Sequence, residues 1–560
     1  MKKTPKRLLG LLLGAAMAFL AIGATTMPAQ ADPTPGDITV SAPEGQSLVG
    51  QTITLYKVFD ATWDGHNAYA YQLDTDFLGT GTQDDFLADV SLAVTEDENT
   101  FATVADLITY MTGTPTDSEI QAFAEALWQW SDENDSVETA HQLVADTTEE
   151  PVVFDNLALG YYLVTGAVAT EDGTVPGTVT SAAVLLTNDE NCDIELKVGI
   201  PTIDKWVHDS EWNEWGKATD ASIGDDVQFM LTSAVPNMAA FTSYTFAMHD
   251  SLDGHFNQPA LTATNFKVTI GGEELTYGDE YTVTLDDPQP TTGTDFTIDF
   301  TNFIQYKTQP GDAIVVTYSA TLNDTALISD TGDLQANVND VYLEYSNNPH
   351  DGGHGTNTTI KHRVKVYSFK FKIFKCYDDG TPNEPIISPL GALVGLAGAH
   401  FELRTVADDE STAIGFTNPA PGVYKANTAD TTGDNTDLVS GDDGYIYLIG
   451  LATGTYYVVE TQAPFGYNPL ELPVNVKIVR TVDGDDYIVD YTDSSVQTGM
   501  GNLNRTLPDG QLDIQNTTGG KLPGTGGMGT TIFTVTGLAI MLAAAAVLIT
   551  RRKMTAAKAQ

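Results

Sequence analysis

The stretch VYSFKFKIFKCYDDG, from Val366 to Gly380, has the alternating pattern of a β-strand. Phe369, Phe371 and Ile373 would share one face, because successive side chains of a strand point to opposite sides. Similar short runs, bounded by Gly, Asp, Asn and Pro, recur in QTITLYKVF, AIVVTYSATL and GTYYVVE. The pattern predicts an all-β protein of tandem Ig-like β-sandwich domains with antiparallel sheets.

One segment departs from this texture. Residues 102–134 read ATVADLITYMTGTPTDSEIQAFAEALWQWSDEN, and the apolar residues Phe123, Leu127 and Trp130 fall at helical spacing. Thr116 or the residue after it would cap the second helix. We therefore expect a small helical insert in the N-terminal domain.

The N-terminus has the three parts of a secretory signal peptide. Basic residues up to Arg7 precede an apolar run over residues 8–24, and the small residues Ala29 and Ala31 follow. The alternative is a first membrane helix, but the apolar run is short for a bilayer crossing. We expect residues 1–31 to be the signal peptide.

The C-terminus has the pattern of a membrane anchor. Residues 530–550 carry no charge and have the length of one transmembrane helix. Arg551, Arg552 and Lys553 follow directly, which predicts that residues 551–560 form a basic cytoplasmic tail. The precursor is thus expected to be a single-pass membrane protein whose bulk lies outside the cell.

Composition agrees with an extracellular location. The chain has 26 basic and 76 acidic residues, a net charge of −50, so it would repel nucleic acid and we expect no such partner. A hydrophobic content of 42% argues for packed cores rather than disorder. Cys192 and Cys376 fall in different predicted domains and are expected to be free thiols.

Two similar junctions divide the middle of the chain. LKVGIPTIDKWVHD and NNPHDGGHGTNTTIKHRVKVYSFK each place a polar or Pro-containing segment before a new strand. We expect domains at 32–198, 199–358 and 359–516, followed by a linker at 517–529.

Three polar residues of the third domain each continue an otherwise apolar strand face: Lys375, Glu460 and Asn516. A buried lysine has a lowered pKa and is nucleophilic when neutral, whereas a buried glutamate has a raised pKa and stays protonated. The protonated acid would polarise the asparagine amide, the amine would attack its carbon, and ammonia would leave. Folding supplies the proximity, so this chemistry needs no cofactor.

A structural explanation fits the same periodicity. Lys375 would then extend to solvent at a sheet edge, Glu460 would pair with it, and Asn516 would cap a turn. Periodicity alone leaves both interpretations open.

The third domain resembles a CnaB-type domain of Gram-positive surface proteins. The resemblance lies in LAGAHFELRT, GDDGYIYLIGLATGTYYVVETQAPFGYN and LDIQNTTGGKLPGTGG. It implies an intramolecular isopeptide bond between Lys375 and Asn516, with Glu460 as the catalytic acid.

The second domain resembles the isopeptide-forming D2, or CnaA-like, domain of backbone pilins. PTIDKWVHD, GDDVQFML, YTFAMHDSLDG, VVTYSATLN and NVNDVYLEYSNNP carry this resemblance. It implies a bond from Lys205 to an asparagine of the last strand, promoted by the acid Asp250. Asn339 is the preferred acceptor, Asn337 has the same parity and stays open, and Asp253 is taken as a turn residue.

A segment of the first domain is similar in sequence to one of the third, but it has no acidic residue at the position of Glu460. NLALGYYLVTGAVA aligns with GLATGTYYVVETQAPFGY, which puts Thr165 opposite Glu460. Lys57 occupies a place like that of Lys375, yet we expect no bond there.

The segment LPGTG fits the L-P-x-T-G sorting signal of sortase substrates, with a Gly-rich spacer, an apolar helix and basic residues behind it. Its residues are Leu522, Pro523, Gly524, Thr525 and Gly526. The resemblance implies that a membrane sortase cuts between Thr525 and Gly526 and passes the Thr525 acyl group to an amine.

The resemblance to polymerising pilins implies that this amine is a lysine at the end of the N-terminal domain. Lys197, in NCDIELKVGIP, stands in that place, although Glu195 and Leu196 replace the Tyr-Pro of the family's motif. An ordinary surface lysine is the alternative. Wall peptidoglycan is the other amine donor that the family uses.

These observations favour the backbone subunit of a sortase-assembled pilus or fimbria on the cell surface. The expected partners are sortase, other pilin subunits and peptidoglycan. The alternative is a monomeric wall-anchored adhesin, or a pilus-tip subunit, that binds a host surface ligand. The sequence has no HExxH, GxSxG or phosphate-binding Gly loop, and its nine His are scattered, so we expect no enzyme and no metal or cofactor site. Asp-rich loops such as GDNTDLVSGDD are interpreted as solvated turns rather than Ca²⁺ sites.

Overall fold

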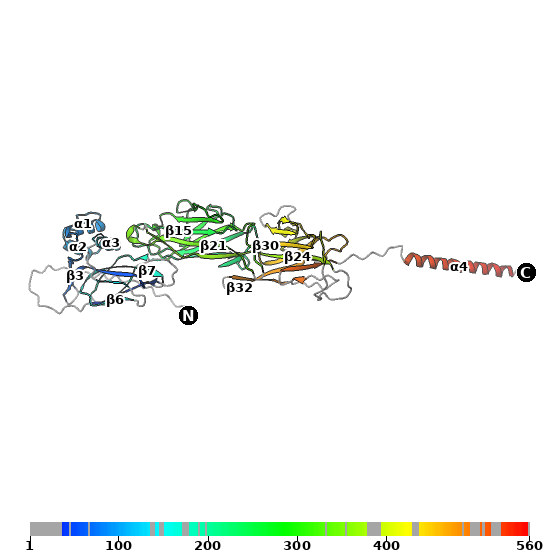
Figure 1. Cartoon of the computed structure of the whole chain (residues 1–560), viewed down its shortest axis with the longest axis horizontal. Helices are drawn as coiled ribbons and strands as arrows, with labels where there is room; N and C mark the ends of the chain where they lie inside the picture. Colours follow the sequence, from blue (N-terminus) through cyan, green and yellow to red (C-terminus); the bar gives the residue numbers. More distant parts are fainter. Residues whose placement is uncertain are drawn as a thin grey trace, which may run out of the picture.

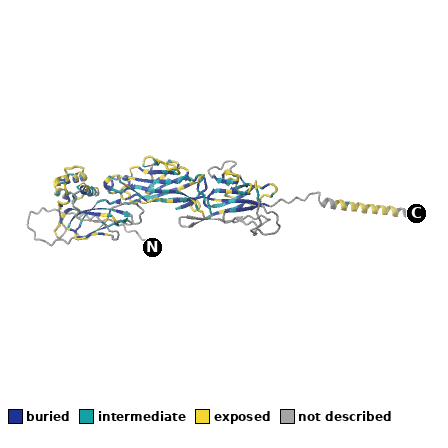
Figure 2. Cartoon of the chain, in the orientation of Figure 1, coloured by how far each residue is buried: buried dark blue, intermediate teal, exposed yellow. Residues whose placement is uncertain are grey.

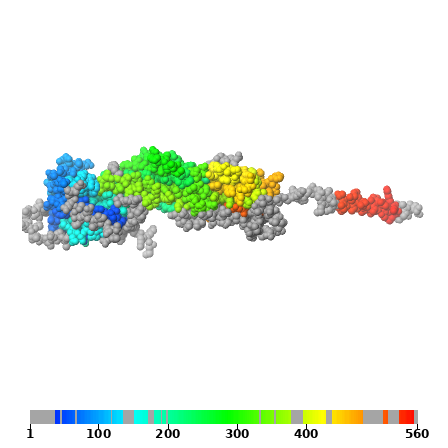
Figure 3. Space-filling model, viewed as in Figure 1, coloured from blue at the N-terminus to red at the C-terminus, as the bar shows by residue number. Residues whose placement is uncertain are grey.

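The chain forms three β-rich domains in a row, with a single long helix set apart from them (Figure 1). This computed structural model describes residues 36–43, 46–64, 68–134, 141–144, 151–170, 179–188, 191–196, 199–330, 333–352, 355–377, 394–427, 436–483, 486–492, 505–506, 510–516 and 528–557. The space-filling view shows the domains as one narrow, elongated body (Figure 3). The prediction of an all-β protein with a small helical insert is confirmed.

In the residues that the structure describes, the first domain combines two sheets with three helices. Its strands are β1 (Ile38–Ser41), β2 (Gln46–Ser47), β3 (Thr52–Trp63), β4 (Tyr69–Leu73), β5 (His141–Val144), β6 (Val152–Phe154), β7 (Gly160–Thr170), β8 (Val179–Thr180), β9 (Val184–Thr187) and β10 (Cys192–Glu195). One sheet has the order β10-β1-β6 and the other β2-β7-β3-β4, with β5 on β3 and with β8 and β9 on β7.

The helical insert packs as the sequence predicts, with one addition. Its helices are α1 (Gln83–Thr95), α2 (Val104–Met111) and α3 (Asp117–Glu133). Thr116 caps α3 in a capping box with Glu119, as expected. The sequence reading missed α1, whose buried Phe86 packs edge-on against Trp130 of α3 at 5.3 Å.

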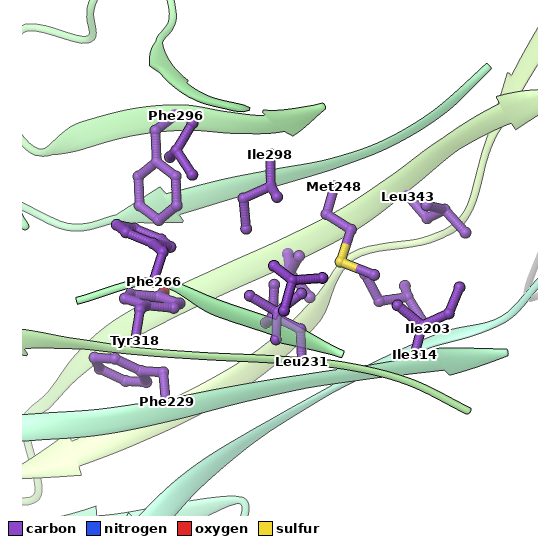
Figure 4. Close-up of a cluster of buried hydrophobic side chains, with 14 of the residues drawn as sticks. Ile203, Phe229, Leu231, Met248, Phe266, Phe296, Ile298, Ile314, Tyr318 and Leu343 are labelled. Carbon is purple, nitrogen blue, oxygen red and sulfur yellow. The ribbon is translucent and has the colours of Figure 1, made fainter. Parts of the chain in front are cut away.

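The second domain is a two-sheet sandwich. Its strands are β11 (Ile203–Asp209), β12 (Glu214–Gly216), β13 (Ala218–Asp220), β14 (Asp226–Ala234), β15 (Phe246–Leu252), β16 (Lys267–Ile270), β17 (Glu273–Glu274), β18 (Tyr281–Leu285), β19 (Thr294–Phe300), β20 (Ala313–Thr321), β21 (Ala336–Ser346), β22 (Thr356–Thr358) and β23 (His362–Tyr367), with 3-10 turns at Phe303–Tyr306 and Pro349–Asp351. The sheet orders are β12-β11-β14-β20-β16-β17 and β13-β23-β21-β15-β19-β18, with β22 on β21. The inward faces of the strands alternate as expected and form one apolar core (Figure 4).

The third domain is a smaller sandwich. Its strands are β24 (Phe369–Tyr377), β25 (Val394–Gly395), β26 (His400–Arg404), β27 (Phe416–Ala420), β28 (Val423–Ala426), β29 (Leu438–Val439), β30 (Tyr445–Leu451), β31 (Gly454–Gln462), β32 (Val474–Asp483), β33 (Asp486–Thr492), β34 (Arg505–Thr506) and β35 (Gln511–Gln515), with a 3-10 turn at Glu410–Thr412. One sheet has the order β27-β28-β30-β24-β35-β34, with β25 on β24, and the other β29-β26-β31-β32-β33. The first and last long strands, β24 and β35, are therefore parallel neighbours.

The border between the second and third domains differs from the expected one at 358/359. Strand β23 pairs with β21 and β13 of the second domain, and its Val364 and Val366 lie in that domain's core. Ser368 separates it from β24, so one alternating run supplies strands to two domains. Periodicity cannot show this change of sheet, because both strands keep the same alternation.

A helix follows the last domain. α4 (Met528–Ala557) contains an apolar stretch, Phe533–Met554, with a mean hydropathy of 2.2. Its side chains are exposed, whereas the sandwich interiors are buried (Figure 2). A helix of this length and composition can cross a bilayer, as the sequence predicts for residues 530–550.

Candidate functional site

The three polar residues of the third domain converge in its core. Lys375 lies on β24, and Asn516 directly follows β35, the parallel neighbour of β24. Glu460 lies on β31 of the opposing sheet and faces the pair across the sandwich. The fold thus places an amine and an amide on adjacent strands, with a carboxyl group above them.

The atoms of this group are in direct contact. Lys375 Nζ lies 2.9 Å from Glu460 Oε1 and donates a short hydrogen bond to Asn516 Oδ1. Asn516 Nδ2 donates to both Glu460 oxygens, at 2.9 and 3.1 Å. The backbone N–H of Leu470 donates to Glu460 Oε2 at 2.7 Å and helps to orient the carboxyl group.

Burial sets the chemistry of this group. The Lys375 and Glu460 side chains have no exposed surface, so the lysine does not extend to solvent at the sheet edge. Burial lowers the pKa of the Lys375 amine below its usual 10.5, although the neighbouring Glu460 raises it. Burial thus favours the neutral form of the amine, and the amine contacts the amide that it would attack.

The second domain contains a comparable group between its two sheets. Lys205 lies on β11 of one sheet, and Asp250 on β15 and Asn339 on β21 of the other. Lys205 Nζ donates a short hydrogen bond to Asp250 Oδ2, and both side chains are fully buried. A lysine–asparagine bond here would join the two sheets, whereas in the third domain it would join neighbours within one sheet.

The structure separates the two candidate asparagines. Asn339 Nδ2 donates a hydrogen bond to the Tyr318 hydroxyl at 2.7 Å. This hydroxyl also contacts Lys205, so Asn339 belongs to the polar group around the lysine. Asn337 is also buried, but it accepts from Leu327 N at 2.7 Å and donates to Val366 O at 2.9 Å. Asn337 therefore ties a loop to the sheet, away from the lysine.

The neighbouring acid, Asp253, has a turn role. It accepts hydrogen bonds from the backbone N–H groups of His255 at 3.0 Å and Val338 at 2.6 Å. These bonds connect the end of β15 to β21, and they agree with the turn assignment made from sequence.

Burial perturbs both ionisable groups of the second site. It lowers the pKa of the Lys205 amine and raises the pKa of the Asp250 carboxyl, and in each case the partner's charge opposes the shift. The directions favour a neutral amine beside a protonated acid. This is the pairing that an amine nucleophile and a general acid require.

Sequence reasoning missed Tyr318 of β20, which contacts all three groups of the second site. Its hydroxyl donates to Asp250 Oδ1 at 2.8 Å and accepts from Lys205 Nζ at 3.1 Å. In AIVVTYSATL the tyrosine is simply one more large residue on the apolar face. The signal was present, because a buried tyrosine hydroxyl needs a polar partner.

The first domain lacks this arrangement around its lysine. Lys57 Nζ forms ion pairs at 2.9 Å with both Asp60 and Asp74. Burial lowers the pKa of Lys57, but these two carboxylates outweigh it and raise the pKa overall. Thr165 lies on β7 opposite Thr54. A lysine held in its charged form is a poor nucleophile, and the absence of a bond here stays a prediction.

Several predicted residues lie outside the part of the chain that the structure describes. These are the signal peptide at 1–31, Lys197, and the sorting signal Leu522–Gly526. Within the described residues, neither Cys192 nor Cys376 forms a disulfide bond. Within the described ranges, no group of three or more His, Cys, Asp or Glu side chains is arranged to hold a metal ion.

Three family models match successive parts of the chain. Residues 223–349 match the Gram-positive pilin backbone subunit 2, Cna-B-like domain, a description that differs from the CnaA-like type expected for this domain. Residues 394–495 match the SpaA prealbumin-like fold domain, and residues 514–555 match the LPXTG cell wall anchor motif. No curated protein matches the chain in sequence.

Solved structures of major pilins are similar at low identity. The T6 backbone pilin of serotype M6 Streptococcus pyogenes is 14% identical, with 88% of this chain and 100% of that chain covered and a TM-score of 0.47. BcpA, the major pilin subunit of Bacillus cereus, is 14% identical, with coverage of 86% and 99% and a TM-score of 0.40. The Corynebacterium diphtheriae major pilin SpaA is 17% identical, with coverage of 86% and 98% and a TM-score of 0.39.

The two domain matches and the anchor match follow one another along the chain, with the anchor motif last. The apolar helix α4 overlaps the matched anchor motif. Residues 223–349 therefore contain a domain of the Gram-positive pilin backbone type, and residues 514–555 carry an LPXTG cell wall anchor motif.

Proposed function

We propose that this chain is the polymerising subunit of a covalent pilus. A sortase cuts between Thr525 and Gly526, and the Thr525 acyl group passes to Lys197 of the next subunit. At the base of the fibre, a peptidoglycan amine takes the place of the lysine. The LPXTG match supports the cut, and the place of Lys197 at the end of the first domain supports its role as acceptor.

Two internal bonds form in each subunit without a cofactor. Lys375 is joined to Asn516 with Glu460 as the acid, and Lys205 is joined to Asn339 with Asp250 as the acid. In each case the lysine nitrogen attacks the asparagine Cγ, a C–N bond forms, and the side-chain Nδ2 leaves as ammonia. The acid gives its proton to the leaving nitrogen, and the carboxylate that results accepts the surplus proton of the lysine nitrogen.

The bonds give the fibre its resistance to force. In the third domain the cross-link ties the first strand to the last, so tension along the chain bypasses the strands between them. In the second domain it ties one sheet of the sandwich to the other. A pulled subunit then cannot peel open strand by strand. The proposal of internal bonds rests mainly on the direct contact of amine, amide and acid in the third domain.

An immunoblot of cell-wall extracts tests the polymer. We expect a ladder of bands that survives boiling in detergent, because the subunits are joined by amide bonds. Lys197→Ala should collapse the ladder to a monomer, whereas Lys267→Ala, at an exposed lysine of the second domain, should leave it intact. A single band from the wild-type chain would instead support the alternative, a wall-anchored monomeric adhesin.

A further inference from the structure

The amine, amide and acid of the two proposed bonds are connected differently. In the third domain Glu460 touches the amine of Lys375 at 2.9 Å and the amide nitrogen of Asn516 at 2.9 Å. One carboxyl group can therefore give a proton to the leaving nitrogen and take one from the nucleophile.

The acid of the second domain reaches only one of the two reactants directly. Asp250 contacts Lys205, but no hydrogen bond joins it to Asn339 among the residues described here. Tyr318 fills the gap: its hydroxyl lies 2.8 Å from Asp250 Oδ1 and 2.7 Å from Asn339 Nδ2. The same oxygen lies 3.1 Å from Lys205 Nζ.

The amide depends on this hydroxyl for its orientation. Asn339 Oδ1 is buried and has no hydrogen-bond partner in the described part of the chain. The Tyr318 hydroxyl is therefore the polar contact that holds the Asn339 side chain beside Lys205. An amide free to rotate would lose the alignment that speeds an intramolecular attack.

The surroundings of Tyr318 keep its hydroxyl fixed and protonated. Its ring stacks on Phe266 at 5.0 Å and packs against Phe229 and Phe296 at 5.3 and 5.4 Å (Figure 4). Burial raises the pKa of Tyr318 well above its usual value, so the hydroxyl keeps its proton at neutral pH. It can pass a proton on only by receiving another at the same time.

We propose that Tyr318 is a catalytic residue of the second domain, which orients Asn339 and relays a proton from Asp250 to the departing nitrogen. This inference rests on the proposed Lys205–Asn339 bond. The neutral Lys205 nitrogen attacks Asn339 Cγ to give a tetrahedral intermediate. The Tyr318 hydroxyl, which donates to Asp250 before the reaction, then turns its proton to Nδ2 and accepts one from Asp250 in return.

The remaining transfers close the cycle. The C–Nδ2 bond breaks and ammonia leaves, while the Asp250 carboxylate accepts the surplus proton of the new Lys205–Asn339 amide nitrogen. Tyr318 and Asp250 end in the protonation states in which they began. The net reaction converts an amine and a primary amide into a secondary amide and ammonia.

Replacing Tyr318 with Phe tests the relay, because the ring stays and the hydroxyl goes. The probe is the intact mass of the full-length chain, purified in detergent from a host without sortase. The wild-type chain should lack two ammonia molecules. Tyr318→Phe should lack one, because the third domain still reacts, and its second-domain bond should form about a hundredfold more slowly or worse.

Tyr281→Phe is the matched control. Tyr281 is also buried in this domain, and its hydroxyl donates to Phe266 O at 2.8 Å, away from the lysine. This variant should lose both ammonia molecules at the wild-type rate. If it slows the second-domain bond as strongly as Tyr318→Phe does, a buried hydroxyl has only a packing role and the relay is wrong.

Folding is checked against Asp250→Asn, which also leaves the second domain unbonded. Tyr318→Phe should melt at the same temperature as Asp250→Asn, because each keeps the aromatic core. A much lower melting temperature for Tyr318→Phe would assign the effect to packing and overturn the relay. A complete, fast bond in Tyr318→Phe would overturn the relay alone, and a wild-type chain without a second-domain bond would overturn the proposed bond as well.

Discussion

Lys375 Nζ lies 2.9 Å from Glu460 Oε1 in the core of the third domain, and neither side chain reaches solvent. Enclosing two ionisable groups in this way costs free energy that their attraction often fails to repay. Asn516 contacts both groups, so the proposed amide bond would offset this cost. Formation of an amide removes the lysine's charge permanently.

The mass of the chain should report this chemistry. Residues 32–520 should be lighter than their sequence by two ammonia molecules, one for each bond. Glu460→Gln should restore one of them, because glutamine keeps the shape of the side chain but cannot exchange the proton. Intact-mass spectrometry gives the answer directly.

Glu402→Gln provides the control for this measurement. Glu402 lies on β26, in the same sheet as Glu460, but it pairs with Arg404 at 2.6 Å. This variant should still lack both ammonia molecules. An unmodified mass for the wild-type chain would reject the internal bonds altogether.

A pair of variants on β21 should identify the acceptor of the second domain. Asn339→Ala should abolish the bond to Lys205, whereas Asn337→Ala should keep it and lose only hydrogen bonds to the backbone. A cross-link that closes a loop of about a hundred residues stabilises a protein by about 5 kcal/mol. Asn339→Ala should therefore melt at a clearly lower temperature and yield to trypsin.

The reverse outcome for the two asparagine variants would also identify the acceptor. If Asn337→Ala regains the mass of ammonia and Asn339→Ala does not, then Asn337 is the acceptor and its backbone contacts must break during the reaction. Peptide mapping of the cross-linked fragment would show the same exchange of roles.

The unbonded third domain should become more stable as the pH rises. In Asn516→Ala the amine of Lys375 stays free, and burial holds its pKa below the ordinary 10.5. Between the two pKa values the unfolded chain binds more protons than the folded one, so the free energy of unfolding increases with pH. The gain is about 1.4 kcal/mol per pH unit in that window and ends above pH 10.5.

Calorimetry of two variants isolates this contribution. The melting temperature of the third domain in Asn516→Ala should climb as the pH approaches 10.5 from below. In the double variant Lys375→Met/Asn516→Ala the same transition should lack this climb. Equal slopes for the two variants would mean that Lys375 is charged in the folded state.

Strand periodicity was enough to place three polar residues on apolar strand faces, because a period of two fixes which face a side chain takes. Lys375, Glu460 and Asn516 interrupt apolar faces and were visible for that reason. Tyr318 was not, since a tyrosine on an apolar face has the pattern of an ordinary core residue. Its role depends on the neighbours that the fold brings to its hydroxyl.

The contacts between domains were beyond sequence reasoning for another reason. Arg480 of β32 bonds to Asp209 of β11, and these residues are 271 positions apart. Neither residue stands out in its strand, because the partner that explains each of them belongs to another domain. The change of sheet at Ser368 was hidden in the same way, inside one continuous alternation.

The junction of the first and second domains should depend on His350. Its ring stacks on Trp128 of α3 at 3.9 Å, while its Nδ1 lies 2.7 Å from Glu125 and its Nε2 3.1 Å from Ser181 O. His350→Ala should weaken the junction by about 2 kcal/mol, from one aromatic pair and one hydrogen bond to a charged group. Faster hydrogen exchange in β8 and α3 would reveal the loosening.

His249→Ala controls for the loss of a histidine within one domain. His249 stacks on Tyr342 at 4.7 Å and lies 3.0 Å from Glu344, both in the second domain. This variant should leave hydrogen exchange at the junction of the first and second domains unchanged. Unchanged exchange in His350→Ala would show that other contacts hold the two domains together.

The junction of the second and third domains should depend on Arg480. Its guanidinium is buried against the carboxylates of Asp209 and Asp220 and lies 4.8 Å from the Trp212 ring. Arg480→Met should lower the free energy of unfolding by about 3–5 kcal/mol, because it leaves two buried carboxylates without a counter-charge. The second and third domains should then unfold in separate calorimetric transitions. The backbone amide of Ile223, which donates to Gly450 O at 3.0 Å across the junction, should exchange its hydrogen faster.

Arg404→Met, which breaks the pair with Glu402 inside the third domain, should leave the Ile223 amide protected. If Arg480→Met also leaves it protected, the strand contacts alone fix the two domains, and the buried arginine has no part in transmitting force between them.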